Sequence, residues 1–462
     1  MTQLFKNKTI KKTTVAFYSI TTLFFLWGFT TVLGDILVPY FKTKFNLDDT
    51  ASMLVQTTFF GAYGIGALLF YLYSHYKTDL LNKIGYKNGI LIGLALATFG
   101  CALYYPISFS DTFYIYLVPL FIIGIGFTFL QIACNPYVTL LGDSKTASSR
   151  LNLAQGINSL GTTIAPVLGA YFLLADTEES QDLAGPFLSL ALIFLCTFIF
   201  ISLQKLPDYK NQNTLSKSNI FKNRQVTFGM LAIFLYVGAE VAIGSKLTEY
   251  LMLDNISHFT RNTAGTFVGI YWGGAMIGRL SSAFIFNKEM TLNNRILYSL
   301  VSTIITFTII LIAIYFTKGL VFNDVYPILY FIPIQFTALI IYKDSTHKVL
   351  ALFAWIIILL LLFAFIFKGQ IAMWCILAIG LFNSIMWSNI FTIAIANLGD
   401  KTAKASSLLI IMITGGAIFP LLMGIVSDKI NLETAYLIPI IAYLYISFYG
   451  IYSTKLTQTK TA

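Results

Sequence analysis

Charged residues are scarce in this chain of 462 residues: Asp, Glu, Lys and Arg make up 11% of it, against about 25% in soluble domains. Hydrophobic side chains make up 57%, and the mean hydropathy is +0.77. A water-soluble fold of this length needs many more polar side chains to cover its surface. The composition therefore excludes an ordinary soluble enzyme and places the chain in a lipid bilayer.

Residues that hold metals or act as nucleophiles are also few. The four cysteines lie in apolar runs, where a thiol behaves as a small hydrophobic group, and the three histidines lie in separate loops. These residues are Cys101, Cys134, Cys196, Cys375, His75, His258 and His347. Neither a zinc site nor a catalytic triad can be assembled from them. We expect no metal, no cofactor and no enzymatic activity.

Positive charge exceeds negative charge, with 30 Lys and Arg against 20 Asp and Glu. In a soluble protein such an excess suggests a nucleic-acid partner, but in a membrane protein it reflects the basic residues of cytoplasmic loops. With the N-terminus inside, 23 of the 30 basic residues fall on the cytoplasmic side. We expect no nucleic acid as partner, and a multi-pass protein of the inner membrane with both termini in the cytoplasm.

Apolar stretches long enough to cross a bilayer recur along the whole chain. Their limits are 15–40, 52–73, 88–105, 113–141, 150–174, 186–203, 226–251, 263–286, 296–316, 325–342, 349–367, 371–396, 403–426 and 434–454. The stretch 325–342 is the weakest, because it is short and contains two prolines, so it could be re-entrant or interfacial. The polar run 205–225 divides a half of six helices (1–204) from a half of eight (226–462).

The two halves repeat each other. Gly28, Gly34 and Tyr40 recur as Gly238, Gly244 and Tyr250 at an offset of 210, whereas Leu141-Gly142-Asp143 recurs as Leu398-Gly399-Asp400 at 257. A six-helix unit duplicated in one orientation, with a two-helix hairpin at about 318–367 inserted after the ninth span, explains both offsets. Two parallel six-helix repeats define the major facilitator fold, in which substrate binds between halves that rock. The predicted fold class is an all-α polytopic membrane protein of this kind, with about 14 spans.

Two carboxylates lie deep inside predicted spans, away from the span ends, where a charge costs about 2.5–3.5 kcal/mol on insertion scales. Asp35 shares one helix face with Trp27 and Thr31, and Glu240 lies one turn beyond Tyr236. A carboxylate that simply faces water at a helix end is the alternative for Asp35, but the polar and aromatic stripe favours a lined cavity. By elimination, Asp35 and Glu240 are the candidates for coupling to H+ or Na+.

Polar stripes run along the fourth and fifth spans. They consist of Thr128, Gln131 and Asn135, and of Asn152, Gln155, Asn158, Ser159 and Thr162. One interpretation is hydrogen bonding between helices in a dry bundle. The functional interpretation is a cavity for a neutral ligand rich in hydroxyls, with Trp27, Trp272 or Trp387 covering an apolar ring face. A sugar fits this chemistry, because amides and a carboxylate can bind several hydroxyls.

Further charged residues are candidates for a cytoplasmic gate. Lys87, Asp143 and Arg150 lie in predicted cytoplasmic loops, where a solvated positive-inside loop is the alternative. Arg279 lies near the cytoplasmic end of its helix, which favours snorkelling or pairing with a cytoplasmic carboxylate over contact with substrate. Lys246 and Glu249, near the outer end of the seventh span, favour an ion pair or an exposed rim.

Five segments carry a resemblance to a known family. They are LWGFTTVLGDILVPY around Asp35, QIACNPYVTLLG from Gln131, SSRLNLAQGINSLGTTIAP from Ser148, YVGAEVAIGS around Glu240 and YWGGAMIGR ending at Arg279. Together they resemble the fucose-galactose-glucose:proton symporters of the major facilitator superfamily. The resemblance implies cation-coupled import of a neutral monosaccharide by alternating access, with Asp35, Gln155 and Asn158 contacting the sugar. We expect the protein to work as a monomer in the bilayer.

The resemblance bears on the substrate through one position. Gln131 occupies the place where L-fucose permease has a proton-coupling glutamate, and an amide cannot titrate. The glutamine is similar to the hexose-transporting branch and favours glucose or galactose over fucose. An exporter of another small molecule is an alternative, because Ala165-Pro166 followed by Gly169 partly resembles an antiporter motif. A membrane sugar sensor that does not transport is a second alternative.

Overall fold

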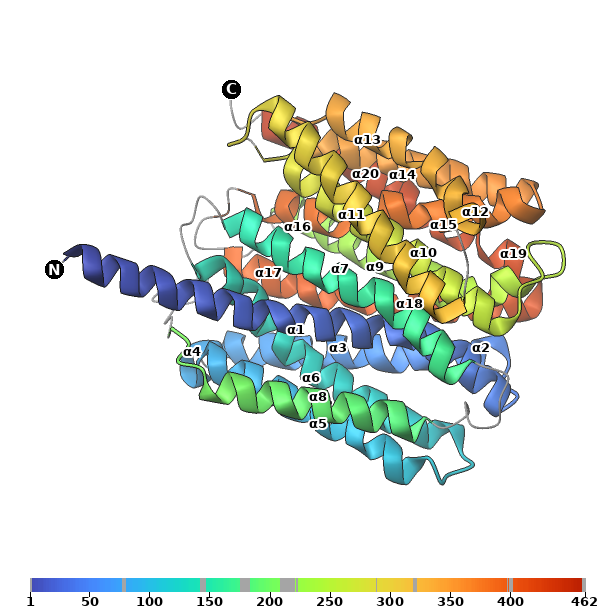
Figure 1. Cartoon of the computed structure of the whole chain (residues 1–462), viewed down its shortest axis with the longest axis horizontal. Helices are drawn as coiled ribbons and strands as arrows, with labels where there is room; N and C mark the ends of the chain where they lie inside the picture. The colour runs from blue at the N-terminus through green and yellow to red at the C-terminus, as the bar shows by residue number, and fades with distance from the viewer. Residues whose placement is uncertain are drawn as a thin grey trace.

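A computed structural model describes residues 2–76, 80–141, 147–174, 183–207, 221, 223–287, 289–318, 322–396, 398 and 402–458. These residues form a bundle of helices that run side by side (Figure 1), and no strand occurs among them. The predicted linker 205–225 and the loop holding Asp143 fall largely or wholly outside the described residues. The all-α class predicted from composition is confirmed.

The first half contains α1 (Thr2–Lys44), α2 (Asp49–Ser52), α3 (Leu54–Tyr76), α4 (Leu80–Ile84), α5 (Tyr86–Ile107), α6 (Phe113–Leu140), α7 (Ala147–Leu173) and α8 (Ala184–Leu203). The second half begins with α9 (Arg224–Met252), α10 (Arg261–Ile285), α11 (Leu292–Lys318), α12 (Phe322–Val325), α13 (Ile332–Ile341) and α14 (Thr346–Ile366). It ends with α15 (Gly369–Asn383), α16 (Met386–Ile395), α17 (Thr402–Ile411), α18 (Gly415–Lys429), α19 (Leu432–Ala435) and α20 (Ile438–Gln458).

Twelve of the described segments are long and apolar enough to cross a membrane. Helices α7 and α10, with 27 and 25 residues, are also long enough but fall outside that count. Both are rich in polar and small residues, because they face each other and a cavity instead of lipid. Adding α7 and α10 to these twelve gives the fourteen spans expected from the sequence, and that count stays a prediction.

Three of the spans are broken. The predicted span 325–342 consists of α12, a 3-10 turn at Tyr326–Tyr330 and α13, and a proline lies at the start of each of the last two segments. The span 371–396 breaks between α15 and α16 without a proline. The span 403–426 passes through a 3-10 turn at Met412–Thr414 before α18. Broken helices at membrane depth are tolerated where the freed backbone groups are bound inside the protein.

The internal repeat indicated by the constant sequence offset also appears in the packing of the helices. Gly161 of α7 lies against α1, where a Cβ would stand 2.2 Å from the carbonyl oxygen of Phe25. Gly415 of α18 lies against α9 in the same way, 1.8 Å from the carbonyl oxygen of Phe234. Only glycine permits such an approach of two backbones. The helix pairs α1–α7 and α9–α18 are therefore equivalent.

The same comparison bears on the extra helix pair. In the first half α5 packs against α6 and α8, and in the second half α14 packs against α15 and α20. Helix α14 thus holds the place of α5, and α11 and α12–α13 have no counterpart in the first half. The packing favours these two, residues 292–341, as the extra pair over the predicted limits of about 318–367. The sequence offsets could not distinguish these two positions of the extra helix pair, because the offset changes somewhere between the eighth span and the next matching string.

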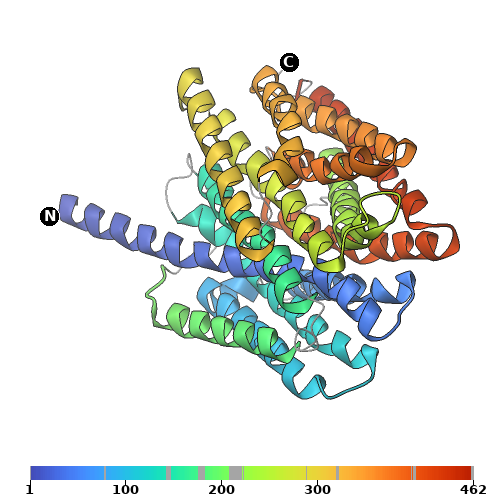
Figure 2. The same ribbon diagram turned by 45° about the vertical axis from the view of Figure 1, so that its right-hand side comes forward.

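The two halves meet along extended seams. Most of the first half lies below and most of the second half above in Figures 1 and 2. Helix α7 packs along α10, and α3 packs along α18. On α10, Cβ atoms at Gly265 and Gly269 would stand 2.9 Å from Cβ of Ala170 and 2.5 Å from a methyl of Val167 on α7. The halves therefore touch closely here, and the space left between them is a defined cavity.

Candidate functional site

A cavity of about 380 Å³ lies between the halves, within the range of small-molecule sites. Its walls come from α1, α3, α6 and α7 on one side and from α9, α10, α16 and the break before α16 on the other. Phe286, Thr346 and Thr392 extend its lining to the ends of α10, α14 and α16 that lie on the side of the linker. We call this side of the bundle the linker side, and the side on which α1 and α9 end the far side.

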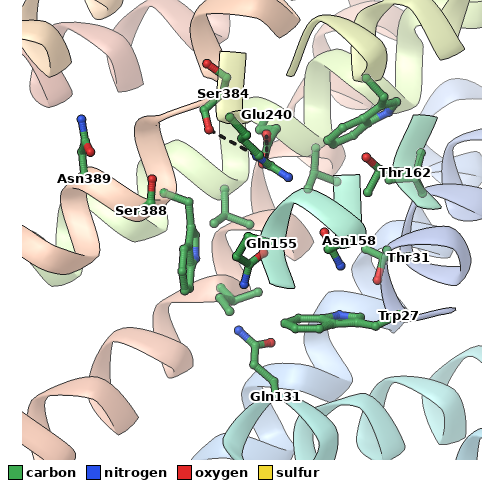
Figure 3. A pocket seen from close by; sticks show the side chains of 18 of the residues that line it. Trp27, Thr31, Gln131, Gln155, Asn158, Thr162, Glu240, Ser384, Ser388 and Asn389 are labelled. Carbon is green, nitrogen blue, oxygen red and sulfur yellow. Dashed lines mark hydrogen bonds and ion pairs between the residues drawn. The ribbon is translucent and has the colours of Figure 1, made fainter. Parts of the chain in front are cut away.

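The first-half wall carries neutral polar groups and an indole. Trp27, Gln131, Gln155 and Asn158 all line the cavity, as the sequence predicted (Figure 3). Asn158 donates to the carbonyl oxygen of Phe24 at 2.9 Å, and the Trp27 indole donates to the Tyr63 hydroxyl at 2.8 Å. The carboxamide oxygen of Gln131 is buried and has no partner among the described residues. These groups can bind hydroxyls without bringing a charge to the ligand.

The second-half wall carries a charge pair. Arg279 lies 3.8 Å from Glu240, and the Tyr236 hydroxyl donates to the same carboxylate at 2.6 Å. Arg279 also donates to the carbonyl oxygen of Ser384 at 3.2 Å and to the hydroxyl of Ser159 at 2.9 Å. Dashed lines in Figure 3 mark its contacts with Ser384 and Glu240. Because Ser159 belongs to α7, the guanidinium joins the two halves.

The position of Arg279 corrects the expectation that it snorkels to the cytoplasmic surface or pairs with a cytoplasmic carboxylate. Its side chain lines the cavity with 17% exposure, and its carboxylate partner, Glu240, lies inside the bundle at 11%. Helix α10 continues to Ile285, so Arg279 is more than a turn from the helix end. The sequence shows the distance of a residue from the end of an apolar run, whereas the packing decides what lies opposite it.

Indole rings line the cavity from both halves. Trp387 follows the break between α15 and α16 and stacks on Phe391, with ring centroids 5.0 Å apart and planes at 10°. Trp272 of α10 also lines the cavity, but its ring nitrogen is turned toward Asp35. With Trp27 on the first half, three of the predicted indoles line one space, and Trp387 and Trp27 can cover the apolar face of a ring from opposite halves.

Asp35 itself does not line this cavity. It is 3% exposed, and its carboxylate accepts hydrogen bonds from Gln56 at 2.9 Å, Ser245 at 3.1 Å and Trp272 at 3.0 Å. Two of these donors belong to the second half. Trp27 and Thr31 face the cavity. Asp35 lies one turn further along the same face of α1 and is covered by the second half. The expected cavity around Asp35 is therefore closed in this conformation, and Asp35 ties the halves together.

Asn135 also lies outside the cavity lining and is buried, with its carboxamide oxygen unpartnered among the described residues. Six of the eight predicted sugar-contacting residues thus share one cavity. Helical spacing placed these residues on polar faces correctly. It could not show how far along each face the open space extends.

The far side is closed by a cluster of charges from both halves. Lys246 of α9 lies 2.8 Å from Asp49 of α2 and 3.0 Å from Glu249, while Lys42 of α1 contacts Asp49 and lies 2.7 Å from Glu249. The Lys246 side chain has no exposure, and the two carboxylates have 12% each. The ion pair expected of Lys246 and Glu249 is present within α9, but it is buried and not an exposed rim, and Asp49 and Lys42 extend it to the first half.

A second carboxylate contact strengthens this closure. Asp428 of α18 accepts hydrogen bonds from the backbone amides of Asp49 at 2.8 Å and Thr50 at 2.7 Å. Ser427, beside it, donates to the Asp49 carboxylate. These partners satisfy amides at the start of the helical turn that leads into α3, a position at which negative charge is favourable. The far side is thus held shut from α1, α2, α9 and α18 together.

The remaining gate candidates lie on the linker side of the first half. Lys87 donates to the carbonyl oxygens of Ser202 at 2.7 Å and Gln204 at 2.9 Å, which close the end of α8. Arg150 donates to the carbonyl oxygen of Val138 at 3.2 Å. Both of these contacts lie within the first half, as expected of a conformation in which the linker side is open. Asp143 lies outside the described residues.

Sequence reasoning missed the partners of Asp35, although one signal pointed to them. Ser245 follows Asp35 by 210 residues, the offset of the first and seventh spans, so these two residues are equivalent positions of the repeat. Equivalent residues on α1 and α9 meet near the axis that relates the halves. Ser384 and Ser388 on the cavity wall had no such signal, because the break between α15 and α16 is not visible in the hydrophobic pattern.

Comparison with known proteins places the chain in context. Residues 18–342 match the model of the Major Facilitator Superfamily. A glucose/galactose transporter of Brucella abortus is 38% identical, covering 95% of this chain and 94% of the relative. The L-fucose-proton symporter of Escherichia coli is 29% identical, covering 94% of this chain and 92% of the relative. A crystal structure of FucP in the outward conformation is 27% identical, with a TM-score of 0.65, covering 96% of this chain and 99% of that one.

Proposed function

The chain belongs to the Major Facilitator Superfamily and, within it, to the fucose-galactose-glucose symporters, and from this premise we propose that it imports a glucose- or galactose-type hexose together with protons by alternating access. The observation that carries the proposal is the cavity between the halves, which is lined by amides and indoles and closed at one side by charges. Its relatives are named as glucose/galactose transporters and L-fucose-proton symporters.

The cavity chemistry supports a neutral sugar. A sugar hydroxyl both donates and accepts, and the amides of Gln131, Gln155 and Asn158 offer both kinds of partner. The charges of Glu240 and Arg279 compensate each other, so the cavity has no net charge that calls for an ionic ligand. The carboxylate of Glu240 can still accept from a hydroxyl, and Trp387 can cover a C–H face of the ring.

The arrangement of the halves supports alternating access. Opening the far side requires the Lys42, Lys246, Asp49 and Glu249 contacts to separate, and closing the linker side requires the walls of the cavity to approach. We propose that the halves rock about the close seam of α7 and α10. The linker side faces the cytoplasm in this proposal, because 23 of the 30 basic residues then lie there.

Asp35 is the proposed site of proton coupling. In the far-side-closed state its ionised carboxylate accepts three hydrogen bonds, two of them from the other half. A protonated Asp35 is a weaker acceptor, so proton binding favours separation of the halves on the far side. After the far side has closed again, proton release toward the cytoplasm leaves the ionised carboxylate that stabilises the closed state. Gln131 cannot take this role, and Glu240 is already paired with Arg279.

The direct test is counterflow of labelled glucose in proteoliposomes, with unlabelled galactose, L-fucose, mannose and N-acetylglucosamine as competitors. We expect competition by galactose and glucose above that by L-fucose. A proton gradient imposed across the membrane should then drive accumulation, and a sodium gradient alone should not. Counterflow without accumulation under any cation gradient would contradict symport, and absence of counterflow with every sugar would contradict the assignment of a sugar.

A further inference from the structure

Among the buried polar side chains of the extra pair of helices, α11 with α12–α13, Gln335 is the one with an atom that has no partner among the described residues. Gln335 of α13 is 1% exposed, whereas Thr337, two residues on, faces outward. Helix α13 packs against α10, whose residues line the cavity, and against α15, which leads into Ser384 of the cavity wall. Burying a carboxamide among apolar side chains costs free energy unless it finds a hydrogen-bond partner. We therefore expect a hydrogen-bond partner for the Gln335 carboxamide close by.

The partner offered to Gln335 is Ser384. A Cβ built at Gly278 would stand 2.4 Å from Nε2 of Gln335 and 2.1 Å from Oγ of Ser384, so the amide and the hydroxyl face each other across this glycine. Both atoms are buried, and neither has a hydrogen-bond partner among the described residues. An amide N–H and a hydroxyl oxygen are complementary donor and acceptor. Glycine at 278 leaves the space that lets them approach.

Ser384 holds a decisive place in the cavity wall. It is the C-cap residue that follows the end of α15, and α16, carrying Trp387 and Ser388, begins two residues later. Its backbone carbonyl accepts from Arg279, and Arg279 in turn contacts Glu240. The orientation of this break thus sets the position of the charge pair and of Trp387. A side chain that holds Ser384 in place from the side away from the cavity therefore also holds the cavity wall that contacts the ligand.

We propose that Gln335 is a positioning residue: after a small side-chain shift its amide N–H donates to the Ser384 hydroxyl. This bond holds the break between α15 and α16 and so orients Arg279, Glu240 and Trp387 toward the substrate. The extra helix pair then contributes to the binding site without touching substrate. This inference rests on the proposed function for its substrate, but its geometric part does not depend on which ligand is bound. Preorganised walls of this kind depend on support from behind the contacting residues.

Transport kinetics give the first arm of the test. In proteoliposomes, Gln335→Leu should raise the KM for the counterflow sugar about tenfold, with the maximal rate changed less than about twofold, because the wall and not the rocking motion is altered. Thr337→Val on the exposed face of the same helix is the control and should match wild type. In a Ser384→Ala background, Gln335→Leu should add no further effect, since the two residues act as one unit. Additive effects would overturn a role through Ser384.

A second arm needs no sugar. Ser388 on the cavity wall is replaced by cysteine in a Cys196→Ser background, because the other three cysteines are buried. Its alkylation by a water-soluble maleimide should become about threefold faster with Gln335→Leu and stay unchanged with Thr337→Val. Equal rates in both, with an unchanged KM, would overturn the inference.

If wild type shows no counterflow, the proposed function fails, while the alkylation experiment still decides the role of Gln335. Gln335→Met replaces Gln335→Leu if the latter is not monodisperse in detergent.

Discussion

The far side and the linker side of the interface between the halves use different chemistry. On the far side Lys42, Asp49, Lys246 and Glu249 form a largely buried cluster of ion pairs, two of which cross the interface. On the linker side the cavity is lined mostly by amides, hydroxyls and indoles. Ionic contacts are strong only while their partners are together, so they suit a gate that must hold and release. Neutral polar groups suit the recognition of a hydroxyl-rich ligand.

The difference also separates the two intramembrane carboxylates. Asp35 belongs to the gate, since two of its three donors come from the opposite half and it is covered on the cavity side. Glu240 belongs to the cavity, where Arg279 and Tyr236 hold it. Two residues that looked alike in the sequence, an acidic group in an apolar span, therefore have different surroundings. Their substitution should have different consequences.

The largest effect should come from Lys246→Met, which breaks the far-side cluster. It leaves Asp49 and Glu249 buried without a fully compensating cation, and loss of one partner of a buried pair costs about 3–5 kcal/mol. We expect transport to fall by more than about a hundredfold. The matched control is Lys368→Met, an exposed lysine paired with Glu433, which should leave the rate within about twofold. A Lys246→Met protein that transports like the control would refute the far-side gate.

Asp35→Asn should separate coupling from exchange. An asparagine keeps the shape and one acceptor oxygen but cannot take up a proton, so accumulation driven by a proton gradient should fall at least about tenfold. Sugar counterflow, which needs no net proton movement, should persist at a substantial rate, with a weaker dependence on pH. The measurement is uptake and counterflow on the same vesicles. Undiminished accumulation would remove Asp35 from the coupling mechanism.

Glu240→Gln should act on the cavity instead. Glutamine can still accept from Tyr236, but Arg279 loses its counterion and the wall gains a positive charge. We expect the KM for sugar to rise about tenfold, equal to about 1.4 kcal/mol, while accumulation relative to exchange is maintained. If accumulation disappeared with exchange intact, the coupling role would belong to Glu240 and not to Asp35.

Gln131→Ala should have a smaller effect. It removes one cavity amide, and a hydrogen bond to a ligand hydroxyl is worth about 0.5–1.5 kcal/mol, so the KM should rise about three- to tenfold. Gln370→Ala, at an exposed amide on the far side, is the control and should leave the KM unchanged. Equal KM values in the two variants would place the sugar away from α6.

The smallest effect should come from Lys87→Glu on the linker side. Its ammonium group caps the carbonyl end of α8, and reversing the charge there costs about 1–2 kcal/mol of local stability. We expect a lower melting temperature in detergent and a rate within about threefold of wild type. A complete loss of transport with an unchanged melting temperature would instead place Lys87 in the cytoplasmic gate.

The sequence predicted much of the fold for simple reasons. Apolar runs of bilayer length and the scarcity of charge require helices that cross a membrane. The offset of 210 between Gly28 and Gly238 reappears as the equivalent packing of α1 and α9 on their neighbours. Six of eight predicted site residues line one cavity because a period of 3.6 residues fixes which side chains share a helix face.

What the tertiary structure decided was the partner of each such face. No periodicity shows that Ser245 and Trp272 cover Asp35, or that Glu240 faces Arg279. These contacts join residues far apart in the chain, and they depend on which conformation the two halves adopt. The sequence by itself determined a membrane bundle of two repeated halves with polar faces turned inward. Only the packing of one half against the other divided those faces into a closed gate and an open cavity.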